Sequence, residues 1–217
     1  MNPAYYDSNY HAFFVRTDAL KNPGILLFIG FHENLHGYVN LSNPKVSQAG
    51  NIGDVTEFRT GPSSVTPAQL EESLVYISID EGFAHWGSLR TARSLKGVFT
   101  HDDFLAFDYP IAYARKSGEN ASNHKKRIIT RFGQDVRDLM ITLPEGSLAA
   151  SLRAIDLVRD IDQIQTVVGY NFVDSFMGTL ENRGMMINAA IDWLIKNPPS
   201  TVSELINPTH YARKAFS

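Results

Sequence analysis

His32, Glu33 and His36 form the one short stretch of this 217-residue chain whose residue types and spacing suggest catalytic chemistry. In a helix, two histidines four residues apart lie on the same face, where both can bind one zinc ion. The glutamate beside the first histidine can then act as a general base on the water that the metal activates. If residues 32–36 were helical, His-Glu-Asn-Leu-His would predict a metal-dependent hydrolase.

These five residues resemble the HExxH signature of zincin metallopeptidases, and the resemblance covers no other part of the chain. The neighbouring sequence does not favour the helix that the signature requires. The preceding run, residues 24–31, is apolar on both alternating faces, as in a buried central strand, and Gly37 would end a helix directly after His36. No downstream glutamate or histidine stands out as a third ligand. We therefore expect residues 32–37 to form a polar loop between two strands.

Two further clusters of histidine and acidic residues follow strand-like runs, at residues 80–85 and 101–103. If the strands are parallel neighbours, all three clusters meet at the carboxyl edge of one sheet. We expect acid–base chemistry there from Glu33, Asp80 and Glu81. The expected ligands of a divalent metal, zinc or manganese, are His32, His36, His85, His101 and Asp102. The simpler alternative is that loops after strands are polar in any protein.

A basic segment in the middle of the chain predicts a second kind of function. Residues 85–137 carry a net charge of +5, whereas the flanking residues 1–84 and 138–217 are net acidic. Residues 122–139 have the apolar spacing of an amphipathic helix. A row of cations there could neutralise the phosphates of a nucleic acid or bind another acidic macromolecule. The candidate residues are Arg115, Lys116, Lys125, Lys126, Arg127 and Arg131. The alternative is an ordinary solvated helix face.

The strand-like and helical segments that would position these residues predict a mixed α/β fold, with an α+β fold as the alternative. Strand-like runs in the N-terminal half would form a central sheet with flanking helices, and the C-terminal third would be mostly helical. Thr66 and Gln69 form a capping box at one helix start, and Thr201 with Glu204 repeats that pattern. Residues 163–170 fit either a strand or a helix. We expect a single domain over residues 1–217, with an internal boundary near 117–123 as the alternative.

Composition excludes several classes of protein. The chain has no cysteine, so a disulfide scaffold, a thiolate metal site and a cysteine nucleophile are excluded. No apolar run approaches the roughly 20 residues of a membrane helix, and the first residues lack a secretory signal, so we expect a cytoplasmic protein without a membrane partner. Three functions remain: a metal-dependent or acid–base hydrolase, a non-catalytic binder of nucleic acid, and a structural component with protein partners. Whether the protein is an enzyme stays open.

Overall fold

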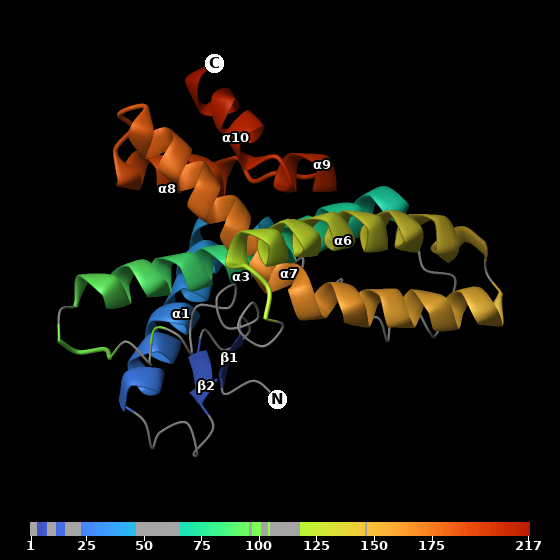
Figure 1. The fold of residues 1–217 in the computed structure, drawn as a ribbon, viewed down its shortest axis with the longest axis horizontal. Helices are drawn as coiled ribbons and strands as arrows, with labels where there is room; N and C mark the ends of the chain where they lie inside the picture. The colour runs from blue at the N-terminus through green and yellow to red at the C-terminus, as the bar shows by residue number, and fades with distance from the viewer. Residues whose placement is uncertain are drawn as a thin grey trace.

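Long helices form most of the described structure (Figure 1). The computed structural model describes residues 4–7, 12–15, 23–46, 66–95, 97–100, 104, 118–145 and 147–217. The first half contains the strands β1 (Ala4–Asp7) and β2 (Ala12–Val15) and the helices α1 (Pro23–Ser42) and α3 (Pro67–Ser94). The second half consists of α6 (Ala121–Thr142), η3 (Leu143–Glu145), α7 (Leu148–Asn182), α8 (Ile187–Lys196), α9 (Val202–Leu205), α10 (Pro208–Tyr211) and η4 (Ala212–Phe216).

The prediction of a mixed α/β or α+β fold with a central sheet is wrong. Among the described residues, the sheet is limited to the antiparallel pair β1–β2, in which Ala4 pairs with Val15 and Asp7 with Ala12. Residues 24–31 lie in α1 and residues 73–79 in α3, although both runs are strand-like in sequence, and the third run, residues 97–100, contains a turn and a bend but no strand. Residues 163–170, where the sequence allowed either structure, lie within α7. A short apolar run fits a buried helix as well as a buried strand, so periodicity alone cannot separate them.

Helix α1 places the histidine motif on its buried face. The buried positions Ile29, Glu33, His36 and Val39 follow one another at spacings of four and three residues, which is the period of one helical face, and the buried Phe28 and Asn40 adjoin them. Leu27, which lies within the run that is apolar on both alternating faces, is exposed, and so is Leu41 further along the helix. The motif therefore continues the apolar stripe of a helix and does not end a strand.

Helix α3 begins where the sequence predicts and continues much further. The Thr66 hydroxyl accepts a hydrogen bond from the Gln69 amide, and the Gln69 side chain accepts one from the Thr66 amide, which confirms the predicted capping box. The strand-like run before residue 80 continues this helix, so α3 runs unbroken for 28 residues to Ser94. Its β-branched residues Val75 and Ile79 are buried, and packing outweighs their modest preference against helix.

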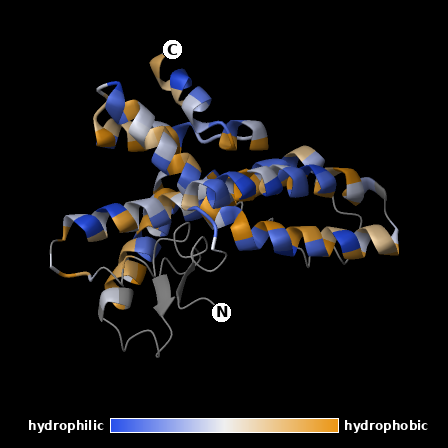
Figure 2. Cartoon of the chain, in the orientation of Figure 1, coloured by the Kyte–Doolittle hydropathy of each residue, from blue (hydrophilic) through white to orange (hydrophobic). Residues whose placement is uncertain are grey.

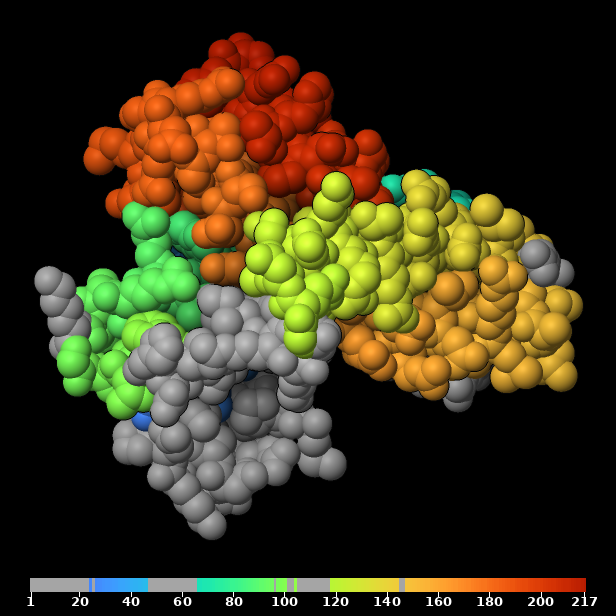
Figure 3. Space-filling view, in the orientation of Figure 1, coloured from blue at the N-terminus to red at the C-terminus, as the bar shows by residue number. Residues whose placement is uncertain are grey.

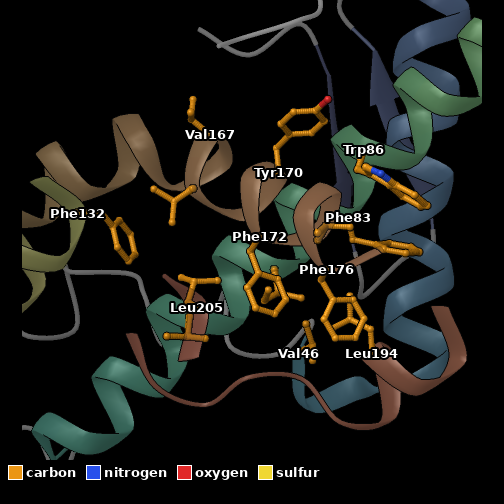
Figure 4. Close-up of a cluster of buried hydrophobic side chains, with 14 of the residues drawn as sticks. Val46, Phe83, Trp86, Phe132, Val167, Tyr170, Phe172, Phe176, Leu194 and Leu205 are labelled. Atoms are coloured by element: carbon orange, nitrogen blue, oxygen red, sulfur yellow. The ribbon is translucent and has the colours of Figure 1, made fainter. Parts of the chain in front are cut away.

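Helices α3 and α7 touch through their backbones. A Cβ atom built on Gly169 would lie 1.6 Å from the carbonyl oxygen of Ser78, and one on Gly82 would lie 2.0 Å from the carbonyl carbon of Gly169. Only glycine at both positions allows the two helices this close an approach. The adjoining core contains Phe83, Phe172 and Phe176 (Figure 4). This contact fixes the position of α3 and of the acidic residues it carries.

Helices α6 and α7 lie side by side as a hairpin closed by η3 (Figure 1). The helix predicted from Ile128, Phe132, Val136 and Leu139 is confirmed, because these side chains are buried on one face of α6. Figure 2 shows polar and apolar residues alternating along both helices. In the space-filling view of Figure 3, the yellow-green side chains of α6 lie on the face toward the viewer. None of the described helices is long and apolar enough to cross a membrane.

Candidate metal centre

Helix α1 holds His32 and His36 with their rings directed at each other. The two Nε2 atoms lie 3.1 Å apart, and the ring centroids lie 4.7 Å apart. One helical turn separates the residues, so the geometry follows from the spacing in the sequence. Phe28, one turn before His32, stacks on the His32 ring at a centroid distance of 6.3 Å. The loop predicted for residues 32–37 is therefore wrong, since these residues form regular helix.

Helix α3 brings two adjacent acidic residues to the same histidines. A carboxylate oxygen of Glu81 lies 3.7 Å from Nε2 of His32, and its other oxygen lies 3.8 Å from Nε2 of His36. Asp80 instead reaches the opposite side of the His36 ring, where its Oδ2 atom lies 2.9 Å from Nδ1. Neighbouring residues on a helix project about 100° apart, so Asp80 and Glu81 contact different ring nitrogens of His36.

The charges of these groups stabilise one another. Burial alone would lower the pKa of His36, but the Asp80 and Glu81 carboxylates outweigh burial and raise it. Burial would likewise raise the pKa of Glu81, but the neighbouring imidazoles of His32 and His36 lower it below the usual value. Without a metal, these shifts favour an anionic Glu81 beside a protonated His36.

Glu33 completes the motif from within the helix interface. Its side chain is buried, and burial raises its pKa, while the charges of His36 and His32 act in the opposite direction. Within the described part of the chain, Oε2 of Glu33, Nδ1 of His32 and Oδ1 of Asp80 are buried without hydrogen-bond partners. Three unsatisfied polar atoms in one place are costly and indicate a site that binds a further polar group.

The ligand atoms suit a metal ion. One ligand atom each from His32, His36 and Glu81 can be chosen so that all three lie within 4.8 Å of one another. Ligands bound to zinc at about 2.0–2.1 Å lie about 3.3 Å apart in a tetrahedral site, so small side-chain rotations would close this set around an ion. Two imidazoles and one carboxylate also match the donors of catalytic zinc sites, which keep their fourth position open.

The other predicted metal ligands have different outcomes. His85 lies one turn beyond Glu81 on α3, but it is not among the three converging ligands. Its buried ring packs against His32 at 6.2 Å, Phe28 at 5.6 Å and Tyr170 at 5.4 Å between centroids. His101 and Asp102 lie outside the described residues. The first two of the three predicted clusters thus meet, but they meet between two helices and not at the edge of a sheet.

The basic residues of α6 are partly neutralised by acidic neighbours. Arg127 pairs with Glu119 at 2.9 Å, and Arg131 pairs with Asp160 at 2.6 Å and with Asp135 at 3.2 Å. Lys126, Arg127 and Arg131 line a shallow hollow of about 620 Å³ together with Asn123, Thr130 and Gln134. Lys125 lies on the same helix, and Arg115 and Lys116 lie outside the described residues. The ion pairs reduce the positive field that an anionic partner would meet.

Sequence reasoning missed the helix under the motif and the role of Glu81 as the third candidate ligand. Helical periodicity from Phe28 through His32 and His36 to Val39 was the signal for the helix. No sequence signal separated Glu81 from the other acidic residues as a ligand, because 44 intervening residues separate it from His36. Comparison with protein-family models, with curated proteins and with solved structures finds no match for this chain.

Proposed function

We propose that this protein is a metal-dependent hydrolase, with zinc held by His32, His36 and Glu81. The observation that carries the proposal is the approach of these three ligand atoms to within 4.8 Å of one another, from two helices, beside the buried Glu33 carboxylate. Because Glu33 stands in the position of the general base in an HExxH motif, the arrangement favours hydrolysis over a purely structural metal site.

The chain's own residues have separate roles in this proposal. His32, His36 and Glu81 would hold the zinc ion with one coordination position left open, and the ion would supply a Lewis acid that lowers the pKa of a bound water. Glu33 accepts the proton of the attacking water and later donates it to the leaving group. A carboxyl group whose pKa is raised by burial is better matched to both transfers near neutral pH than an exposed one. Amide and ester bonds are the substrates that fit this chemistry.

Metal content is the first measurement. Protein purified from zinc-supplemented medium should contain close to one zinc ion per chain. A His32→Ala/His36→Ala variant should contain none, whereas His210→Ala, which removes an exposed histidine on α10, should retain the metal. Equal zinc in all three proteins would refute the site. Iron in place of zinc would refute the hydrolase, because two histidines and one carboxylate also bind iron in oxygenases.

Glu33→Gln separates catalysis from metal binding. The variant keeps the size of the side chain and removes its ability to take a proton. We expect full zinc content and a loss of hydrolysis of about 10²–10⁴-fold, assayed with a pooled library of fluorogenic peptides and esters. Unchanged hydrolysis in Glu33→Gln, or no zinc-dependent hydrolysis in the unmodified protein, would reject the proposed mechanism.

A further inference from the structure

We propose that Asp80 is a positioning residue that orients His36 for metal binding and does not take part in proton transfer to substrate. The inference rests on the proposed metal site. It assigns Asp80 a role different from that of Glu81, although the two residues are adjacent in the sequence and belong to the same acidic pair.

The geometry separates the two carboxylates. Oδ2 of Asp80 lies 2.9 Å from Nδ1 of His36, whereas the oxygens of Glu81 approach the Nε2 atoms of the two histidines. An imidazole that donates Nδ1–H to a carboxylate has its Nε2 lone pair available for a metal. Asp80 therefore selects the ring nitrogen of His36 that faces His32 and Glu81.

The two histidines differ in how firmly they are held. His36 is fixed on one side by Asp80, and its side chain is only 10% exposed. Among the described residues, Nδ1 of His32 has no corresponding partner, although that atom is buried. A ligand whose ring is already oriented loses less freedom when a metal binds. His36 is therefore the preorganised ligand, and His32 adjusts to the ion.

Three variants separate orientation from charge. Asp80→Ala removes the hydrogen bond and the charge, and Asp80→Asn removes the charge but keeps an oxygen that can accept from Nδ1. Asp162→Asn is the matched control: burial and the charge of Glu81 raise the pKa of the Asp162 carboxyl on α7, and this carboxyl accepts a hydrogen bond from Gln165. Loss of an outer partner of a ligating histidine typically weakens metal binding about 10–100-fold.

Zinc affinity of the full chain, measured by competition with a chromophoric chelator, should fall about 10–100-fold in Asp80→Ala. It should fall less in Asp80→Asn and by less than about threefold in Asp162→Asn, where only a distant charge is lost. The ring nitrogens of His36 provide a second readout. In long-range ¹H–¹⁵N spectra of the zinc-loaded protein, Nδ1 should carry the proton and Nε2 the metal, and Asp80→Asn should preserve this pattern.

Each outcome has a distinct meaning. Equal zinc affinity in Asp80→Ala and the unmodified protein would overturn the role of Asp80 while leaving the metal site standing. Equally large losses in Asp80→Asn and Asp80→Ala would also overturn it, because the loss of charge alone would then explain both. Failure of the unmodified protein to bind zinc would refute the metal site itself. If Asp80→Ala does not fold, the ¹H–¹⁵N spectrum of zinc-loaded Asp80→Asn decides the question, because a metal on Nδ1 of His36 would refute the orienting role.

Discussion

Gly169→Ala should separate α3 from α7 and strongly destabilise the protein. The added Cβ atom would lie 1.6 Å from the carbonyl oxygen of Ser78, roughly 1.8 Å short of the 3.4 Å at which ordinary contact begins. Neither neighbour can rotate away, because the atoms that collide with the methyl group belong to helix backbone. The two helices must therefore separate where they pack against each other in the core.

The magnitude follows from the packing that this movement disrupts. A gap of 0.5–1 Å already removes about a quarter to a half of the attraction between packed atoms, and the required shift is larger. Extra methyl groups in packed cores usually cost about 1–3 kcal/mol. We expect a loss of at least about 3 kcal/mol for Gly169→Ala, since backbone rather than a rotatable side chain must yield.

Gly178→Ala is the matched control on the same helix. A Cβ atom at Gly178 meets nothing within 4 Å, so this substitution should raise stability by about 0.5–1 kcal/mol through helix propensity alone. Urea unfolding followed by far-ultraviolet circular dichroism measures both variants. If the two substitutions change the free energy of unfolding equally, the direct contact between the α3 and α7 backbones is refuted.

Two further predictions concern the ends of helices. Thr66→Ala removes the hydroxyl that accepts a hydrogen bond from the Gln69 amide and should lower the free energy of unfolding by about 0.5–2 kcal/mol. Thr66→Ser is the control that retains the cap, and equal unfolding midpoints for the two variants would refute the contribution of the cap. Burial would raise the pKa of Glu204, but hydrogen bonds from Lys214 and from the Ser200 amide lower it. The stabilisation from Glu204 is thus present above its unfolded pKa of about 4.3 and is lost as the pH falls through the lower folded value. In urea titrations, the difference in free energy of unfolding between the unmodified protein and Glu204→Gln should shrink as the pH falls through that range. A difference independent of pH would contradict the prediction.

Helix starts and amphipathic faces were predictable because they depend on nearby residues. Thr66 with Gln69, and Thr201 with Glu204, mark helix starts whose capping hydrogen bonds are local. The apolar spacing of α6 is likewise visible without knowledge of the fold. The boundary predicted before residue 80 is wrong, because α3 continues as one long helix through the strand-like run 73–79. Because this helix is buried along much of its length, packing keeps its β-branched residues helical.

The histidine motif shows the division between sequence and tertiary structure most clearly. The sequence by itself determined the types and the spacing of His32, Glu33 and His36, and therefore the chemistry that a helix would give them. It did not determine that residues 24–42 form a helix, because an apolar run of that kind is equally compatible with a strand.

Only the packing of α1 against α3 decided which acidic residues complete the site. Asp80 and Glu81 follow His36 by more than forty residues, and their distances to the two histidines depend on how the helices cross. Helix α3 is held in place by the contact between Gly82 and Gly169, far from the motif in sequence. The proposed ligand set is therefore a product of helix packing, because a metal requires ligands within a few ångströms and sequence spacing specifies such distances only within a single helix.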